Sequence, residues 1–420
     1  MTGDMAEWYD DCRSSTNVVV RFRSYSSRSG RFPSMSARSY LLAAGAFAVG
    51  TSAYVVSGVL PAVSAELDVS VTAAGQLTTA FALAYAVSAP LIATVTARWE
   101  RRRLLLAALL VAAAGNAISA IATTYPLLLG GRIVAALGAA AYTPAATLFA
   151  TVLRPPEERG RAVAIVFGGL TLSLALGVPL SSLLAGGIGY RWVFALVAFV
   201  SVLAAAAVRL QLPYLAGSPA VPLRERFAVA ADGRVLTVLA ITVFGVVATM
   251  SVYIYVVPLL TATTGLTGST IGSLLLAYGL GALVGNAAGG RSTDRFGSIP
   301  TLFATLAGFV VMIATLPFTA TTAVGAAVAL FVWSVFTWSF NPPVQSLLLE
   351  LAPSGGLVLS LNASAIYFGM GLAGVLGGTV IGAVGVLALP EVGAVLGLVV
   401  LGLLLALRSG GRRTAPALAD

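Results

Sequence analysis

Twelve long apolar runs, separated by short polar breaks, constrain this chain more than any other feature of its sequence. A helix needs about 20 residues to cross about 30 Å of hydrocarbon, and each run is long enough. Only 9% of the residues are charged, whereas a soluble domain carries about 25%. Polar side chains therefore cannot cover the surface, and we expect an all-α membrane protein with twelve transmembrane helices. The expected spans are 40–63, 72–97, 103–124, 126–152, 160–187 and 190–210, followed by 234–260, 269–291, 297–317, 322–349, 356–384 and 388–407.

A repeat with an offset of 197 residues divides the chain into two halves. The pairs that keep this offset include Arg98 with Arg295, Pro61 with Pro258, and Gly177 with Gly374. Helix-breaking residues and a charged turn in one register predict two pseudo-symmetric six-helix halves, and such halves in a membrane are typical of transporters.

The polar segments between and around the halves complete the expected organisation. We expect a disordered N-terminal extension, a six-helix half, a cytoplasmic linker, a second six-helix half and a cytoplasmic tail. These parts cover 1–38, 39–210, 211–233, 234–408 and 409–420. Met35 directly precedes the first run, so an alternative start codon there would remove 1–34.

The arginines predict the orientation, because cytoplasmic loops carry an excess of basic residues. With the N-terminus inside, 22 of the 24 arginines fall in cytoplasmic segments. Arg191 falls outside, as do Glu66, Asp68 and Glu391, while Arg132 falls within a span. We expect a multi-pass protein of the plasma membrane (a bacterial inner membrane) with both termini in the cytoplasm.

Two compositional facts exclude several kinds of site. The chain contains no histidine, and Cys12 is its one cysteine. Disulfide frameworks, Cys/His metal sites and histidine proton relays are therefore excluded. The arginines form short clusters between apolar runs and no continuous basic face, so we expect no nucleic-acid partner. Buried nucleophiles and paired acids are lacking too, so we expect no enzyme activity, no cofactor and no bound metal.

The segment Gly290–Gly297 reads Gly-Arg-Ser-Thr-Asp-Arg-Phe-Gly. It resembles the loop motif Gly-x-x-x-Asp-Arg-x-Gly of the major facilitator superfamily. The first half carries a degenerate copy, in which Ala93, Ala97 and Glu100 replace the first glycine, the aspartate and the last glycine. The resemblance covers about residues 39–408 and is to the bacterial drug:proton antiporter branch, with its chloramphenicol-type and sugar-efflux-type exporters.

Other segments are similar to the same family. Gly50-Thr51-Ser52-Ala53-Tyr54 resembles its first span, where a glutamate commonly stands at the position of Ala53. Gly177-Val178-Pro179-Leu180 resembles the antiporter motif of the fifth span, although Ser181 and Ser182 replace glycines. The resemblance implies a central cavity that opens alternately to either side of the membrane.

Polar and aromatic side chains within the spans are the candidate substrate-binding residues. In the tenth span, Trp333, Thr337, Asn341 and Gln345 recur every four residues, which places them on one helix face. The full candidate set is Tyr54, Tyr142, Tyr253, Tyr255, Trp333, Asn341, Gln345, Asn362 and Tyr367. Such a lining suits a moderately hydrophobic ligand that is neutral or weakly charged. The alternatives are that these groups join helices or form interfacial belts.

Arg132 is the one formal charge that we place inside a span. A guanidinium at the bilayer centre costs at least about 2.5 kcal/mol, so we expect it to face the protein interior and to find acceptors such as backbone carbonyls or Asn116. The alternative is an arginine that extends to the outer interface. The resemblance implies a coupling or gating role for Arg132, Arg98, Glu100, Asp294, Arg295, Gly177 and Pro179.

The function that these patterns favour is export of small molecules, drug-like compounds or sugars, by alternating access. The resemblance implies proton antiport. However, no Asp, Glu or His lies deep in any span, and a proton-driven transporter usually needs such a group. A proton-independent facilitator or metabolite exporter therefore stays open as the alternative. We expect a monomer whose partners are the substrate, the lipid bilayer and, under antiport, protons.

Overall fold

The computed structural model describes residues 35–153, 159–217, 232–352 and 355–413, and the structural statements below concern these residues. Most of the predicted N-terminal extension, the middle of the predicted linker and the end of the predicted tail lie outside the described residues. The same is true of residues 154–158 and 353–354.

The described chain is helical, with no strand in the ranges just given. The first half contains α2 (Met35–Glu66), α3 (Val71–Val95), α4 (Arg101–Ile121), α5 (Tyr125–Val152), α6 (Arg159–Leu172), the π-helical turn η2 (Ser173–Gly177), α7 (Val178–Ile188) and α8 (Tyr190–Gln211). The second half contains α10 (Gly233–Tyr253), α11 (Val256–Thr264), α12 (Ser269–Phe296), α13 (Ser298–Thr319), α14 (Ala323–Ser339), α15 (Asn341–Leu351), α16 (Gly355–Val384), the 3₁₀ turn η4 (Val386–Ala388) and α17 (Leu389–Arg413).

Twelve of the described helical segments are long and apolar enough to cross a membrane, which confirms the predicted number of spans. Three predicted spans are interrupted rather than continuous. The fifth contains η2 between α6 and α7, the seventh breaks at Ile254–Tyr255, and the tenth breaks at Phe340. The repeat is therefore approximate: Pro61 lies within the unbroken α2, whereas Pro258 lies in α11, just after a break.

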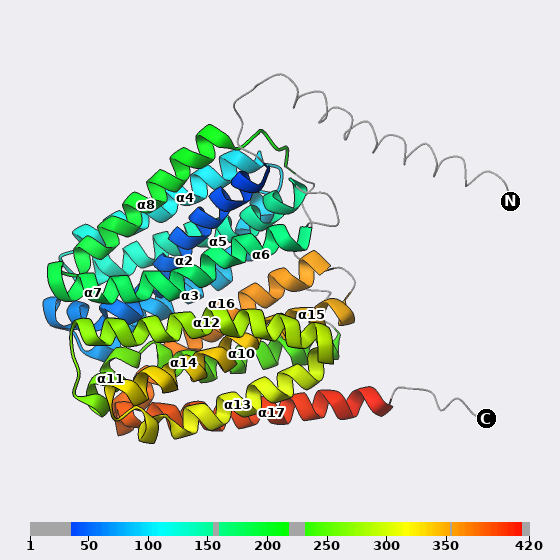
Figure 1. Cartoon of the computed structure of the whole chain (residues 1–420). Helices are drawn as coiled ribbons and strands as arrows, with labels where there is room; N and C mark the ends of the chain where they lie inside the picture. The colour runs from blue at the N-terminus through cyan, green and yellow to red at the C-terminus, as the bar shows by residue number, and fades with distance from the viewer. Residues whose placement is uncertain (1–34, 154–158, 218–231, 353–354, 414–420) are drawn as a thin grey trace, which may run out of the picture.

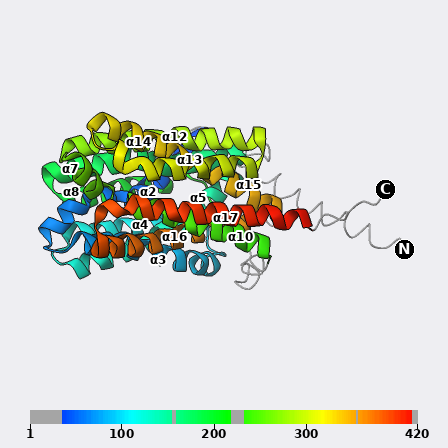
Figure 2. The same ribbon diagram turned by 90° about the horizontal axis from the view of Figure 1, so that it is seen from below.

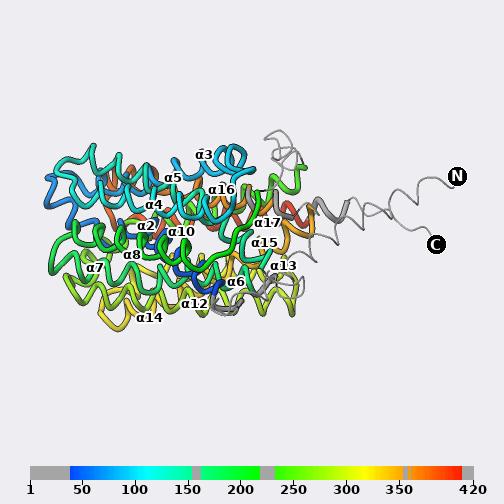
Figure 3. The backbone as a smooth tube through the Cα atoms, turned by 90° about the horizontal axis from the view of Figure 1, so that it is seen from above, coloured from blue at the N-terminus to red at the C-terminus, as the bar shows by residue number. Residues whose placement is uncertain are grey.

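The helices form the two predicted halves (Figure 1), with α2 to α8 in one bundle and α10 to α17 in the other. Figures 2 and 3 view the same bundle from below and from above and show α3 beside α16 in both directions. The helices contact across the halves mainly as α3 with α16 and as α12 with α7 and η2. This arrangement is the predicted twelve-helix fold of two pseudo-symmetric halves.

The two ends of the bundle differ in charge. One end holds Arg98, Arg103, Arg234, Arg295 and Arg408, and we call it the arginine-rich end. The opposite end carries the loops that follow α2 and precede α8, where Glu66 pairs with Arg191 at 2.9 Å. Figure 1 shows the halves diverging toward the arginine-rich end.

Small residues let the helices pack closely within each half. The positions of Gly115 and Gly138 face the backbones of Ala135 and Ala112, so that α4 and α5 approach at their main chains. The hydrophobic effect does not drive helices together in lipid, so van der Waals contacts between closely packed small residues stabilise their association instead. The alanine and glycine content of the spans thus serves packing directly.

Candidate functional site

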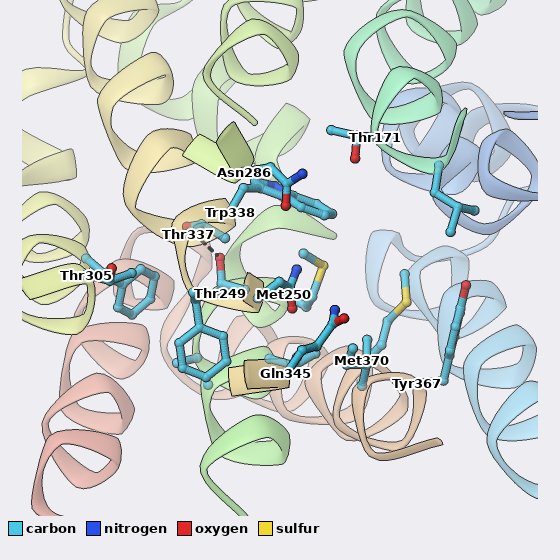
Figure 4. A pocket seen from close by; sticks show the side chains of 18 of the residues that line it. Thr171, Thr249, Met250, Asn286, Thr305, Thr337, Trp338, Gln345, Tyr367 and Met370 are labelled. Atoms are coloured by element: carbon cyan, nitrogen blue, oxygen red, sulfur yellow. Dashed lines mark hydrogen bonds between the residues drawn. The ribbon is translucent and has the colours of Figure 1, made fainter. Parts of the chain in front are cut away.

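A cavity of about 170 Å³ lies between the two halves, near the middle of the helices. Figure 4 shows its lining from close by. The first half contributes residues of α2, α3, α5 and α6, and the second half contributes residues of α10, α12 to α17. No lining residue is charged among those that the structure describes. The cavity is therefore an apolar space with a few hydrogen-bonding groups, as expected for a neutral ligand.

A stacked tyrosine pair closes one side of the cavity. The rings of Tyr85 (α3) and Tyr367 (α16) lie 3.5 Å apart between centroids and 19° from parallel. Tyr54 of α2 also lines the cavity. The pair joins the two halves at mid-depth and presents an aromatic surface to any molecule that enters.

Three carboxamides line the second-half side of the cavity: Asn286 of α12, and Asn341 and Gln345 of α15. The break at Phe340 sets the position of the last two, because α15 restarts at Asn341 with Pro342 and Pro343 in its first turn. Proline is suited to a first turn since its missing N–H has no intrahelical partner there. Each carboxamide offers both donors and acceptors to a ligand.

Two threonines tie α10 to α14 beside these carboxamides. The hydroxyls of Thr249 and Thr337 lie 3.4 Å apart, and both residues line the cavity (Figure 4). One helical turn further from the arginine-rich end, Tyr253 and Trp333 lie on the same faces of their helices. Tyr253 stacks on Tyr278 with centroids 4.4 Å apart. The threonine pair thus stands between the cavity and a packed aromatic core.

Four of the nine predicted substrate-binding residues line the cavity, namely Tyr54, Asn341, Gln345 and Tyr367. The other five are buried elsewhere: Tyr142, Tyr253, Tyr255, Trp333 and Asn362. None of these five side chains is part of the cavity lining.

The contacts of three of these residues show what they do. Tyr142 donates to the carbonyl of Leu42 at 2.9 Å, and Asn362 accepts from the Thr242 hydroxyl at 2.9 Å. Tyr255 donates to the Gly374 carbonyl of α16 at 3.0 Å, within the second half. The residues that recur every four positions in the tenth span therefore lie in two environments. Trp333 is buried in the core, whereas Thr337, Asn341 and Gln345 line the cavity.

Several cavity residues were not among the predicted ones. Asn286 is a carboxamide within an apolar span, and polar residues inside membrane spans often mark functional sites. Tyr85 and Thr143 are similar polar interruptions of apolar runs. Met250, Met370 and Phe167 carry no polar signal, so the sequence pattern does not separate them from ordinary core residues.

Arg132 is fully buried inside the first half and does not line the central cavity. Its Nη2 donates to the Ser52 carbonyl at 2.5 Å, and its Nη1 to the Ser52 hydroxyl at 3.4 Å. That hydroxyl donates to the Asn116 carboxamide oxygen at 3.1 Å. The guanidinium also lies 4.5 Å from the centre of the Phe81 ring. The interior placement was predicted, and the alternative of an arginine that extends to the interface is wrong because the side chain is 0% exposed.

The two copies of the charged loop motif have different local structures. In the first, the Glu100 carboxylate accepts from the N–H groups of Arg102 and Arg103, both at 3.2 Å, and so caps α4. In the second, Gly297 has φ +85°, a left-handed conformation that favours glycine. The first copy therefore begins its helix with a side-chain cap, whereas the second begins its helix after a glycine with positive φ.

The charged groups of the two copies also differ in burial. Glu100 is 9% exposed and lies within 3.7 Å of Arg102 and 3.5 Å of Arg103. Asp294 and Arg295 are exposed. Arg98 is exposed as well, and its backbone lies against Gly217 at the start of the linker.

Gly177 and Pro179 lie where the fifth span changes from η2 to α7. A side chain at position 177 would collide with Thr51, so α2 approaches the end of η2 closely only with glycine there. The repeat mate Gly374 faces Thr79 across the halves instead. The two glycines thus serve different interfaces despite their matching positions.

Comparisons with known proteins agree with this architecture. Residues 42–238 and 239–419 each match the family described as Major Facilitator Superfamily. The MFS-type transporter YbcL of Bacillus subtilis is 33% identical over 356 residues, which cover 84% of this chain and 91% of that protein. A chloramphenicol resistance protein of Streptomyces lividans is 34% identical over 260 residues, which cover 61% of this chain and 66% of that protein. The crystal structure of a D-xylose-proton symporter has a similar fold, with a TM-score of 0.70 at 17% identity, over 87% of this chain and 96% of that one.

Proposed function

The chain belongs to the Major Facilitator Superfamily, and from this premise we propose that it exports small uncharged molecules across the plasma membrane by alternating access. The observation that carries the proposal is the cavity between the halves, which is lined by aromatic rings and carboxamides and by no charged residue among those described. An ion would lose its hydration there without a counter-charge, whereas a neutral ring with polar groups loses little.

The cavity supports a compact substrate that carries both a ring and hydrogen-bonding groups. Its volume is about 170 Å³, and an apolar cavity of about 150 Å³ binds benzene. The Tyr85–Tyr367 pair offers a face for stacking, and Asn286, Asn341 and Gln345 offer partners for hydroxyl, carbonyl or amide groups. We propose neutral drug-like aromatic compounds as the substrate class; the similarity to a chloramphenicol resistance protein supports this choice over sugars.

The distribution of arginines supports a cytoplasmic location for the arginine-rich end. The specific contacts between α3 and α16 run from Thr72 and Gly378 at the opposite end to Tyr85 and Tyr367 at mid-depth. Toward the arginine-rich end the halves diverge (Figure 1). We propose on this basis that the described conformation faces inward and takes substrate from the cytoplasm.

Two modes of energy coupling are compatible with export. Proton antiport is the mode implied by the family branch. A proton-independent facilitator is the second candidate, and the charge-free lining favours it, since no described cavity residue can gain or lose a proton near neutral pH. In the same structure Arg132 is buried and hydrogen-bonded to Ser52, with no carboxylate partner among the described residues.

Transport into inside-out membrane vesicles tests the function and separates the two modes. The probe is a labelled neutral aromatic amide, with a permanently charged ring compound of similar size as comparison. We expect saturable uptake of the neutral compound alone. Antiport requires that uptake falls when a protonophore collapses the imposed pH gradient, and the facilitator requires that initial uptake is unchanged. Preferential uptake of the charged compound would overturn the proposed substrate class.

A further inference from the structure

A second pocket, remote from the central cavity, lies at the arginine-rich end of the second half. It has a volume of about 230 Å³ and lies between the ends of α10, α13, α15 and α17. Its lining consists of Arg234, Ile299, Leu347, Leu351, Leu407 and Arg408. Two guanidiniums therefore meet four aliphatic side chains, and no described residue of this pocket lines the transport cavity.

The two arginines are the charged residues of the pocket lining. Arg234 and Arg408 are exposed, and neither guanidinium forms an ion pair with a carboxylate of the described residues. The acids nearby have other partners: Asp232 accepts from the Arg234 backbone N–H at 2.7 Å, and Glu350 accepts from the Ser298 hydroxyl at 2.7 Å. A guanidinium binds phosphate through paired hydrogen bonds.

One helix end adds to the positive potential of the two arginines. α10 begins at Gly233 and is already capped by the Asp232 carboxylate, whereas α13 begins at Ser298, next to Ile299 of the pocket, without a side-chain cap. Unpaired backbone N–H groups at a helix N-terminus favour an anion. At α13 no side chain caps these groups, because the preceding residue is Gly297.

The four aliphatic side chains of the pocket, which we call the aliphatic floor, favour an amphiphilic ligand over a free anion. Leu347 is 5% exposed and Leu407 is 9% exposed, and both lie under the arginines with Ile299 and Leu351 beside them. Inorganic phosphate gains nothing from hydrocarbon contact, whereas an amphiphile pairs a phosphate with an acyl chain. The pocket also lies at the ends of membrane-spanning helices, at the level where lipid headgroups meet the protein.

We propose that this pocket binds one anionic phospholipid, with its phosphate on Arg234 and Arg408 and the start of an acyl chain on Leu347, Leu351 and Leu407. The bound lipid bridges α10 and α17, which pack against each other in the second half. The proposal rests on the transmembrane fold and is independent of the transported substrate.

Native mass spectrometry of the purified full-length chain tests the proposal. The probes are phosphatidylglycerol, phosphatidylcholine and inorganic phosphate, titrated separately. We expect one phosphatidylglycerol to bind the wild-type chain, with phosphatidylcholine at least about tenfold weaker. The variants Arg234→Gln and Arg408→Gln each weaken phosphatidylglycerol binding by about tenfold or more, since each removes charged hydrogen bonds to the phosphate. The matched control is Arg209→Gln, an exposed arginine in the last turn of α8 at the same end.

A third variant tests the floor separately. Leu351→Trp keeps both arginines and fills the aliphatic part, so we expect it to lose phosphatidylglycerol while the elution volume on size exclusion stays unchanged. The proposal is overturned if both arginine variants bind phosphatidylglycerol as the Arg209→Gln control does. It is also overturned if phosphatidylcholine binds equally well, or if millimolar inorganic phosphate displaces the lipid while Leu351→Trp leaves binding intact, which identifies a free-anion site.

Discussion

A single arginine shows how a charge is tolerated within a span. Arg132 is surrounded by the Ser52 carbonyl and hydroxyl and by the rings of Phe81 and Phe194, at 4.5 and 5.6 Å from their centres. Backbone dipoles and ring faces thus take the role of a counter-ion. The side chain thus links α5 to α2 within the first half.

Arg132→Lys is therefore not a conservative change. Lysine presents a point charge without the planar fork, so it cannot keep both bonds to Ser52 and the stacking on Phe81. Loss of a desolvated cation–π contact costs about 2 kcal/mol. We expect Arg132→Ala to abolish transport and Arg132→Lys to reduce it by about tenfold or more, with normal amounts of folded protein in the membrane. Transport at the wild-type rate in Arg132→Ala would remove any coupling role from this residue.

The carboxamides make the second prediction at this scale. Asn341→Ala removes hydrogen bonds worth about 0.5–1.5 kcal/mol each, so we expect KM for a neutral amide substrate to rise by about three- to tenfold. Transport kinetics in vesicles measure it, with Gln211→Ala at the end of α8, outside the cavity, as the control. An unchanged KM in both variants would show that α15 does not contact the substrate.

At the scale of elements, the two copies of the loop motif begin the following helix in different ways. The turn before α13 uses the left-handed Gly297, whereas the turn before α4 uses the Glu100 side chain as an N-cap. The motif pattern locates both turns in the sequence. It does not reveal the cap, because the resemblance marks Glu100 as a replaced glycine and a gating candidate, and neither indicates a side chain that caps α4.

The two acidic residues of this motif should consequently differ in phenotype. Glu100→Gln weakens a cap whose loss typically costs about 0.5–2 kcal/mol, so we expect a lower melting temperature with modest loss of transport. Asp294→Asn alters an exposed group and should leave the melting temperature unchanged while impairing transport more strongly. Equal transport defects in the two variants would mean that both loops share the gating task.

The contact of α3 with α16 includes a shared hydrogen-bond acceptor on the side of the bundle opposite the arginine-rich end. Gln76 Nε2 and the Tyr255 hydroxyl both donate to the Gly374 carbonyl, at 3.1 and 3.0 Å. Tyr255 reaches it because the seventh span breaks at Ile254–Tyr255. Side chains from α3 and from the break between α10 and α11 thus bind the same backbone carbonyl of α16.

Removal of both donors should favour the conformation that opens at this end. In a Cys12→Ser background, Met250→Cys places a thiol at the cavity. We expect an impermeant maleimide applied from the opposite end to label it several-fold faster when Gln76→Leu and Tyr255→Phe are added. The double variant without the new cysteine controls for background, and identical labelling rates would show that the contact does not hold the gate.

At the scale of the whole molecule, apolar runs and a repeat were sufficient to predict the fold. Twelve spans follow from run length, and two halves follow from an offset that Arg98 and Arg295 share. The cavity lining was only partly predictable. Helical spacing places Asn341 and Gln345 on one face, but it cannot show that Trp333 on the same face is covered by α10 and α12. Packing between spans decides which polar groups remain at the cavity, and a single sequence does not record that packing.

The central claim is that uncharged molecules cross the membrane through the cavity between the halves. Ala363 lines it from α16, and Ala363→Trp should fill the cavity without disturbing the arginine-rich end. The decisive measurement is uptake of a labelled neutral aromatic amide into proteoliposomes containing wild-type or Ala363→Trp protein. We predict saturable uptake by the wild type and none above protein-free liposomes by the variant. Equal uptake by both proteins would contradict the claim.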